Sequence, residues 1–230
     1  WSDRLVVRNL DTNEVLADLQ VPYDATASGA IAGGGSVARQ ASFVLPQGPR
    51  GAGHLSFTVT ADLANDVVET NIQGVAELNN TTTLTLTAAL APYPDLVVTD
   101  VTPAPAVGWL PGDTVTAAWT TRNQGDGATS GSWNETLRVR NLTTGQTLFT
   151  LDVPYNAAAL GDIAAGGVSN RNVNLTWPAG ANANGRIEFT VTSDTAGQVF
   201  ENNAAGTAES NNAMQSVVLW VEARPGDRVE

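Results

Sequence analysis

Short runs of alternating apolar and polar residues recur along the chain. In "DTVTAAWTT" (113–121), Val115 and Trp119 fall on one face, and threonines fall on the other. The segments "RIEFTVTS" (186–193) and "TLRVR" (136–140) alternate in the same way. A period of two over this length is typical of strands with one buried face. Because no long stretch repeats at the helical period, the sequence predicts an all-β fold.

The second part of the chain contains about seven such runs in roughly 130 residues, which is the density of an antiparallel β-sandwich of immunoglobulin type. Polar segments such as "NLTTGQ" (141–146) separate neighbouring runs and predict hairpin turns. Trp119 is a candidate for the core. The predicted strands lie near 95–102, 113–122, 135–141, 147–153, 168–176, 186–193 and 213–222.

The chain repeats itself at a constant offset of 132 positions. "WSDRLVVRNL" (1–10) matches "WNETLRVRNL" (133–142), and "FTVTAD" (57–62) matches "FTVTSD" (189–194). Self-similarity at a fixed offset indicates copies of one structural unit. The sequence therefore predicts tandem sandwiches.

The two predicted domains are not equally complete. A complete repeat is expected over 92–230, and a truncated repeat over 1–91, which has no counterpart of residues 93–132. The first copy therefore lacks the N-terminal strands near 95–102 and 113–122. Missing strands leave an apolar face and unpaired edges. We expect these strands to come from an upstream segment of a longer parent chain or from a neighbouring chain that donates them.

Composition narrows the classes of function. The formal net charge is -12, and all 11 basic residues are arginines. This acidity argues against nucleic acid and anionic membrane surfaces as partners, and it suits cations. The chain has no cysteine and a single histidine, His54, so thiolate metal sites and a histidine-based catalytic triad are not expected. No apolar run reaches the ~18 residues of a membrane span. With no catalytic constellation visible, we expect a protein that is not an enzyme.

A polar skeleton is repeated in "TADLANDVVETNIQGVAELNN" (60–80) and "TSDTAGQVFENNAAGTAESNN" (192–212). Carboxylate and amide oxygens are ligands that calcium prefers. If the strands on either side of each loop pair, the two ends of the loop meet and a cation could join them. The candidate metal ligands are Asp62, Glu69, Glu77, Asn79, Asp194, Glu201, Glu209 and Asn211.

A purely architectural interpretation of these loops stays open. Asp at the end of a strand commonly forms a turn with its own backbone, and Asn tolerates left-handed conformations. Gly74 and Gly206 can supply positive φ. The matched Trp1 and Trp133 could stack on sugars if exposed, although their surroundings favour packing. Trp109, in a predicted turn, is the better candidate for an exposed aromatic.

"PDLVVTDV" (94–101), "PGDTVTAAWTTRNQGDGATSG" (111–131) and "DTAGQVFENNAAGTAESNN" (194–212) together resemble the CARDB family, the cell-adhesion-related domains found in bacteria. Relative to the shorter family pattern, this chain carries an insertion, "NAAGTA" (203–208), between Glu201 and Glu209. The resemblance implies immunoglobulin-like repeats in large secreted or cell-surface proteins. It implies an adhesive or spacer role, with neighbouring repeats, neighbouring chains or surface glycans as partners.

Two alternatives to the spacer remain open. One is a sugar-binding accessory module of a secreted hydrolase, which a contiguous strip of exposed aromatic residues would favour. The other is a filament subunit in which neighbouring chains share strands.

Overall fold

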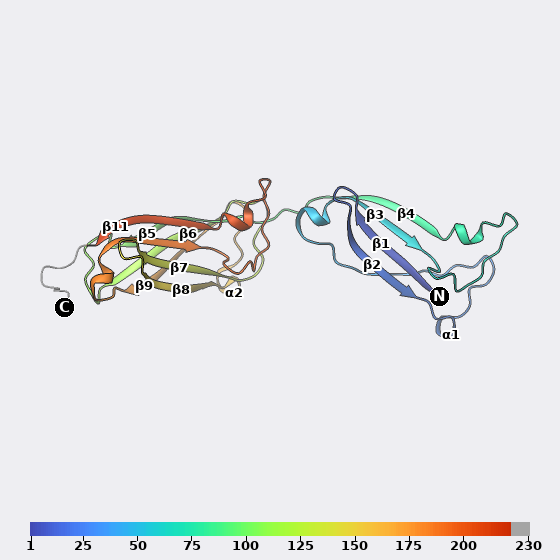
Figure 1. The fold of residues 1–230 in the computed structure, drawn as a ribbon, viewed down its shortest axis with the longest axis horizontal. Coiled ribbons are helices and arrows are strands. Elements are labelled where there is room, and N and C mark those ends of the chain that lie inside the picture. The colour runs from blue at the N-terminus through green and yellow to red at the C-terminus, as the bar shows by residue number, and fades with distance from the viewer. Residues whose placement is uncertain (222–230) are drawn as a thin grey trace. The chain divides into compact units, whose positions relative to one another are not determined.

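A computed structural model describes residues 1–221, with the backbone alone for residues 215–220. The chain splits into two compact units, Trp1–Ala91 and Pro92–Glu230, which we call unit 1 and unit 2 (Figure 1). Residues 222–230, which the sequence analysis includes in the second domain, lie outside the described residues. All strand pairs are antiparallel, so the all-β antiparallel prediction is confirmed.

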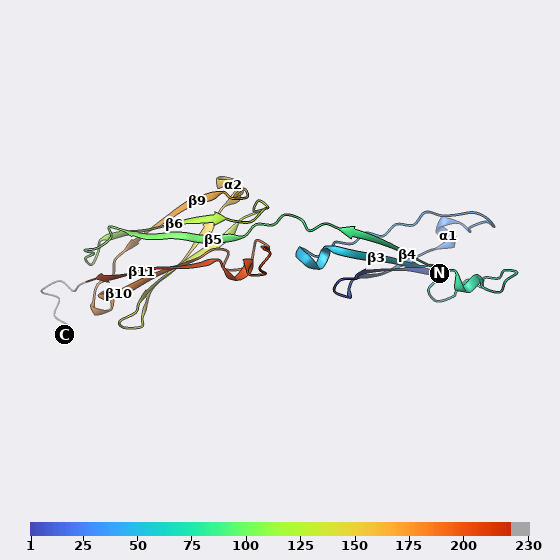
Figure 2. The same ribbon diagram turned by 90° about the horizontal axis from the view of Figure 1, so that it is seen from above.

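Unit 1 contains a single four-stranded sheet with the order β2-β1-β3-β4. Its strands are β1 (Ser2–Asn9), β2 (Glu14–Pro22), β3 (Gly53–Thr60) and β4 (Thr81–Ala88). Its short helical turns are α1 (Ala25–Ser28), η1 (Gly48–Gly51) and η2 (Ala76–Leu78). Within the described residues, no second sheet covers this one, and the edge-on view shows one sheet with an extended segment beside it (Figure 2).

Unit 2 contains two sheets, with the orders β11-β10-β7-β8 and β5-β6-β9. Figure 2 shows them as two layers. The strands are β5 (Leu96–Ala104), β6 (Thr114–Asn123), β7 (Trp133–Asn141), β8 (Thr147–Tyr155), β9 (Val168–Thr176), β10 (Gly185–Thr192) and β11 (Ala213–Val221). The short helical turns are α2 (Ala157–Leu160), η3 (Ala181–Ala183) and η4 (Ala208–Ser210). Each strand overlaps one of the seven predicted runs, so those predictions are confirmed.

Both sheets of unit 2 supply side chains to one apolar core. Trp119 on β6 is buried there, as the sequence predicts. Trp109 is also buried, so its prediction as an exposed aromatic is wrong. The segment between β5 and β6 places the Trp109 ring centroid 4.6 Å from that of Trp177. Its indole Nε1 donates a hydrogen bond to the carbonyl of Pro105 at 2.6 Å. A turn position in the sequence does not fix which way the side chain points.

Elements of unit 1 recur in unit 2 after the same offset of 132 residues. β3 corresponds to β10, α1 to α2, and η2 to η4. The exception is β9, whose counterpart, residues 36–44, forms no strand. In unit 2, β9 pairs with β6, and unit 1 has no strand equivalent to β6 among its described residues. The two copies therefore do not match strand for strand at this segment.

The helices of the described residues are short. None of them is long and apolar enough to cross a membrane.

Candidate metal centre

The acidic loop of unit 2 connects two paired strands. β10 and β11 are antiparallel neighbours, with Thr192 opposite Ala213. Beyond that pair, the backbone N–H of Ser193 donates to the carbonyl of Asn212 at 2.9 Å. The two ends of the loop therefore meet, which confirms the pairing assumed from the sequence.

Asp194 organises the start of this loop. It lies at φ 43°, a left-handed conformation that Asp tolerates better than most residues. Its Oδ1 accepts from the N–H of Gln198 at 2.7 Å, and its Oδ2 accepts from the N–H of Val199 at 2.9 Å. The carboxylate is buried, and it satisfies two backbone donors that the turn would otherwise leave unpaired.

Asp62 does the same in unit 1. It lies at φ 44°, and its two oxygens accept from the N–H groups of Asp66 and Val67 at 2.9 and 2.8 Å. The architectural interpretation of the repeated skeleton is therefore supported at this position in both units.

Glu201 and Glu209 lie across the loop from Asp194. Glu209 Oε1 accepts from the N–H of Glu201 at 2.8 Å. Glu201 is 2% exposed. Its Oε1 accepts from the side-chain amide of Asn212 at 2.9 Å, and its Oε2 accepts from the backbone N–H of Leu96.

Burial makes Glu201 a weak acid. The pKa of Glu201 is raised to about 8, mainly by loss of hydration and to a smaller extent by the nearby charges of Glu209 and Asp194. The hydrogen bonds from Leu96 and Asn212 favour the charged form and act in the opposite direction. No cationic side chain contributes to the shift. A divalent cation would offset both the burial and the mutual repulsion.

The three carboxylates of unit 2 converge. Asp194, Glu201 and Glu209 each offer one oxygen, and these oxygens lie within 4.8 Å of one another. Oxygens that ligate one calcium at about 2.3–2.6 Å lie at comparable separations from each other. The structure thus brings together three of the four candidate ligands in this unit. It also leaves the Oδ1 atoms of Asn211 and Asn212 buried without a hydrogen-bond partner.

Asn211, the fourth candidate, is turned toward the start of the unit. Its Nδ2 donates to Asp95 Oδ1 at 2.9 Å, and Nδ2 of Asn203 donates to Asp95 Oδ2 at 2.8 Å. Together with Glu201 and Leu96, these contacts tie the loop before β11 to the first residues of β5. Sequence reasoning missed Asp95 and Leu96, because the partners are separated by more than a hundred positions. The only signal was the "PDLVV" run (94–98) that carries the family resemblance.

The candidates of unit 1 behave differently. Glu77 Oε1 accepts from the N–H of Glu69 at 2.6 Å, which repeats the contact seen in unit 2. Among the side chains that the structure describes, the carboxylates of Asp62, Glu69 and Glu77 do not form a second convergent group. The other carboxylate oxygen of Glu77, Oε2, is buried without a hydrogen-bond partner.

A second buried carboxylate, also missed from the sequence, lies between the sheets of unit 2. Glu135 on β7 is fully buried. Its Oε2 accepts from Arg171 Nε at 3.0 Å and from Trp119 Nε1 at 3.1 Å, and its Oε1 accepts from the hydroxyl of Thr121. These contacts join β7 to β6 and β9.

The matched tryptophans pack against tyrosines. Trp133 stacks on Tyr155 with ring centroids 3.8 Å apart and is buried. Trp1 stacks on Tyr23 at 4.2 Å and is half-buried. His54 is exposed, and its Nδ1 lies 2.9 Å from Asp11 Oδ1.

Residues 93–216 match the family model of the CARDB domain. The chain belongs to the CARDB family. The resemblance drawn from its motifs is thereby confirmed, and CARDB domains are cell-adhesion-related domains of bacteria. Comparison with curated protein sequences gives no match.

Several solved structures are similar to this CARDB chain. The CARDB domain of a Pyrococcus furiosus protein, in complex with di-metal ions, is 19% identical over 58% of this chain and 97% of that one, with a TM-score of 0.37. A β-glucosidase from Erythrobacter marinus is 13% identical over 56% of this chain and 16% of that one, with a TM-score of 0.35. A β-glucosidase from Streptomyces venezuelae in complex with D-glucose is 17% identical over 57% and 16%, with a TM-score of 0.28. The chain spans less than a fifth of either glucosidase.

Proposed function

We propose that this chain is a structural and adhesive repeat unit of a bacterial extracellular or cell-surface protein. In this proposal, unit 2 is a complete immunoglobulin-type sandwich that acts as a stiff spacer without catalytic activity. The observation that carries it is the set of ties from Asp95 and Leu96 to the loop before β11. These ties join the start of the first strand of the unit to the loop that leads into its last strand, where a pulling force would act.

The proposal treats unit 1 as a second copy of the same domain that lacks two strands. Support comes from matched details as well as matched elements. Tyr23 and Tyr155 donate their hydroxyls to the carbonyls of Gly29 and Gly161 at 2.8 and 2.9 Å. The neighbours of each unit are then further repeats or chains, and glycans on a surface are the proposed adhesive partners.

Single-molecule pulling tests the spacer role. The full chain, held by handles at both ends, should show one cooperative high-force event for unit 2. Asp95→Ala should lower that force, because Asn203 and Asn211 lose their acceptor. The matched change Asp152→Ala, which removes an exposed contact to Thr136, should leave the force unchanged. Equal forces for all three proteins would contradict the proposal, and so would glycoside hydrolysis by the purified chain.

Exposed aromatic residues are the feature that would favour a sugar-binding accessory module instead. Among the described side chains, the exposed large apolar residues are all aliphatic. We therefore place the spacer role ahead of the sugar-binding role.

We further propose that Asp194, Glu201 and Glu209 hold calcium in unit 2. The convergence of three carboxylates without a cationic neighbour supports this assignment. Extracellular calcium modules bind with Kd of roughly 10⁻⁴–10⁻³ M. At ten times Kd, binding would stabilise the folded unit by about 1.4 kcal/mol.

The calcium assignment has a matched control within the chain. A chelator should lower the melting temperature of unit 2, and Asp194→Ala should abolish the difference. Asp62→Ala in unit 1 removes the same pair of backbone contacts from a loop without the convergent group, so the calcium response should persist. A melting temperature that ignores both chelator and added calcium would leave the loop with its architectural role alone.

A further inference from the structure

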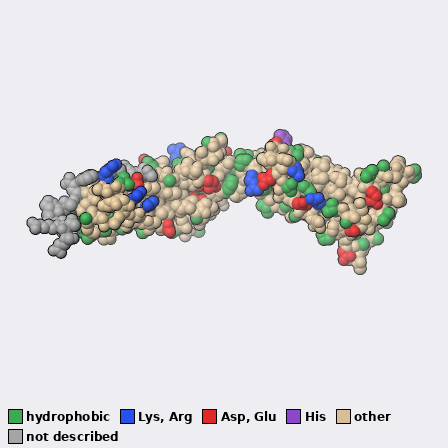
Figure 3. Space-filling view, in the orientation of Figure 1, with side chains coloured by type: hydrophobic (Ala, Val, Ile, Leu, Met, Phe, Trp, Pro, Cys, Tyr) green, Lys and Arg blue, Asp and Glu red, His purple; other side chains and the backbone are tan. Residues whose placement is uncertain are grey.

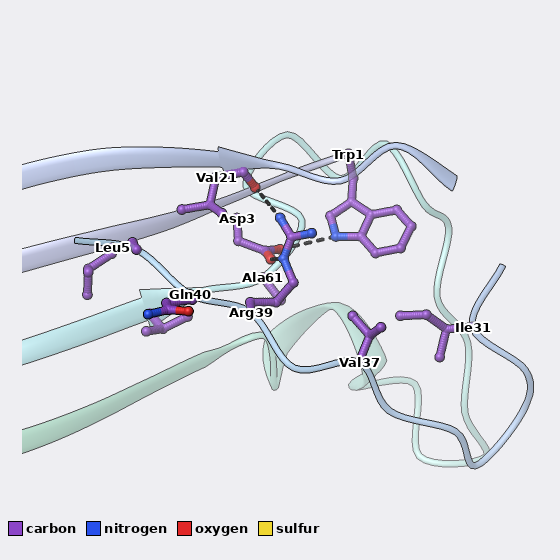
Figure 4. Close-up of a pocket in the computed structure, with 11 residues that line it drawn as sticks. Trp1, Asp3, Leu5, Val21, Ile31, Val37, Arg39, Gln40 and Ala61 are labelled. Carbon is purple, nitrogen blue, oxygen red and sulfur yellow. Dashed lines mark hydrogen bonds and ion pairs between the residues drawn. The ribbon is translucent and has the colours of Figure 1, made fainter. Parts of the chain in front are cut away.

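In the described structure, no second sheet packs on the face of the unit 1 sheet that carries Leu5 and Val59, and the extended segment 31–41 covers that face only in part. A pocket of about 420 Å³ lies between the two, lined by Trp1, Leu5 and Val59 on the side of the sheet and by Ile31, Val37 and Arg39 on the side of the segment (Figure 4). The lining is mostly aliphatic, and Val59 is 40% exposed although it lies in β3, one of the two inner strands of the sheet. Green apolar side chains are visible at the surface of unit 1 in the space-filling view (Figure 3).

Unit 2 shows what covers the equivalent face. Leu137 and Val191, which correspond to Leu5 and Val59, are fully buried. They share one core cluster with Val98 of β5 and with Val115 and Trp119 of β6. The cover is therefore the sheet β5-β6-β9, which also contributes Leu175 of β9 to this cluster. Unit 1 already contains the counterpart of β9, so the part of the cover that it lacks is the hairpin β5–β6, whose sequence specifies the chemistry that this face accepts.

We propose that the open face of unit 1 binds a β-hairpin of the β5–β6 type: two antiparallel strands with an aliphatic inner face and a Trp-x-Thr donor pair. The inference rests on the proposed repeat relationship of the two units and goes beyond the spacer role. It assigns one occupant, a polypeptide hairpin from outside residues 1–230.

The polar groups of the face are arranged for such a hairpin. Arg39 pairs with Asp3 at 3.3 Å and donates to the carbonyls of Val21 and Pro22 at 2.7 Å (Figure 4). Arg171 pairs with Glu135 and donates to the carbonyl of Pro154 in the same way.

The difference between the two pairs lies in the extra donors. Glu135 also accepts from Trp119 and Thr121 of β6. Among the residues that the structure describes, Arg39 alone contacts Asp3 Oδ2, whereas Asp3 Oδ1 accepts from the indole N–H of Trp1 and the backbone N–H of Asp62. An incoming Trp-x-Thr strand would supply the missing donors to Asp3.

The loop of unit 1 that contains Glu69 and Asn80 also lacks a partner that its counterpart in unit 2 has. In unit 2, the start of β5 gives its Leu96 N–H to Glu201, which also holds Nδ2 of Asn212. In unit 1, Asn80 corresponds to Asn212, and its Nδ2 is buried without a hydrogen-bond partner. A hairpin that begins with Asp-Leu would reach this loop and complete the Glu69 site.

Residues 36–44 supply the third indication. Their counterpart β9 pairs with β6, with Trp119 opposite Arg171. An incoming strand beside Arg39 would give this extended segment the partner it lacks.

A second copy of the chain is a poor occupant. Its own β5–β6 hairpin is already buried in unit 2. Moving that hairpin to another molecule would expose an equal apolar face on the donor, with no net burial.

The test extends the full chain by a copy of its residues 92–132 joined directly before Trp1, because Ser132 precedes the matching Trp133 in unit 2. Hydrogen–deuterium exchange should slow by at least ~10-fold at residues 36–44 and in β1, while unit 2 serves as the internal reference. A scrambled extension should give no protection. Replacing the tryptophan that corresponds to Trp119 by Ala in the extension should weaken the protection.

A second arm keeps the test decisive if the extended chain misfolds. A synthetic peptide of residues 92–123 is titrated into the unmodified full chain, and the same exchange is measured. Leu5→Asp, which places a charge on the half-buried face, should abolish binding. Unchanged exchange in both arms would overturn the proposal. Dimerisation of the unmodified chain that Leu5→Asp prevents would also overturn it, because a second copy would then be the occupant. Neither result would affect the force or calcium measurements on unit 2.

Discussion

Two buried glutamates of unit 2 occupy opposite electrostatic surroundings. Glu135 has an arginine partner and hydroxyl and indole donors, so its charge is matched where it lies. Glu201 has neutral donors and two acidic neighbours. The first group fixes the packing of strands, whereas the second responds to protons and cations.

The stability of unit 2 should depend on pH through Glu201. The pKa of Glu201 is raised to about 8 in the folded chain, whereas an exposed glutamate has a pKa near 4.5. The folded state therefore binds the proton more tightly, and this contribution is complete below pH ~4.5 and is lost as pH rises to ~8. Without calcium, unfolding free energy should fall by at most about 1.4 kcal/mol per pH unit across this window.

Denaturant titrations between pH 4.5 and 8.5 measure this dependence. Glu201→Gln keeps the shape without the titration and should flatten the profile, while Glu69→Gln in unit 1 should not. Calcium should restore stability mainly above pH 7, where it competes with fewer protons. A wild-type profile as flat as that of Glu201→Gln would show that the carboxylate ionises freely.

Removing Glu135 should be far more damaging than removing an exposed acid. Glu135→Ala leaves Arg171 largely buried without its partner, which typically costs about 3–5 kcal/mol. Asp18→Ala, which breaks the exposed pair with Arg4, should cost less than about 1 kcal/mol. Urea unfolding compares the two variants, and similar losses would contradict a structural role for the buried pair.

At the scale of elements, the structure shows that a strand exists only where its partner does. Residues 36–44 carry the counterpart of the β9 sequence, yet they form no strand because unit 1 offers no neighbour like β6. Loops depend on context in the same way. The loop before β11 is held by its own turns and also by the start of β5.

Gly125 should be intolerant of a side chain. A Cβ at this position would lie 2.4 Å from the carbonyl oxygen of Tyr93 and 2.6 Å from the backbone nitrogen of Asp95. Gly125→Ala should therefore push the start of β5 away and cost about 1–3 kcal/mol. Gly33→Ala in unit 1 meets nothing within 4 Å and is the matched control. Thermal unfolding of both variants measures this difference. An unchanged melting temperature for Gly125→Ala would mean that the contact relaxes freely.

Strands were predictable because alternation is a local property. The spacing of Val115, Ala117 and Trp119 is enough to place them on one face of a strand. The convergence of Asp194, Glu201 and Glu209 was also within reach, because two paired strands enclose a single loop. The contacts of Asp95, Leu96 and the buried Glu135 could not be predicted from the sequence, because they join strands whose arrangement a sequence pattern does not specify. The prediction that Trp109 is exposed was wrong for the same reason.

At the scale of the whole molecule, the two units differ in how much apolar surface they bury. Both sheets of unit 2 enclose a core that includes Trp119 and Phe189, whereas unit 1 has one sheet with an open face. Elements with fewer buried contacts open at lower free energy. The molecule should therefore behave as two parts of unequal stability.

Calorimetry of the full chain should show two transitions, with unit 1 melting first. Glu135→Ala and Gly125→Ala should move only the upper transition, whereas Leu55→Ala, which truncates a buried side chain of unit 1, should move only the lower one. A single transition that all three variants shift together would show that the units fold as one.

The ties from Asp95 and Leu96 to the loop before β11 also govern the order of events during synthesis. They link residues 105 to 116 positions apart. Contacts so distant in the sequence form late and slow the folding rate. Unit 2 should therefore stay unfolded on the ribosome until almost all of it has emerged. A chain that crosses a membrane unfolded would gain from that delay, since its last strand locks the first only after both have arrived on the far side.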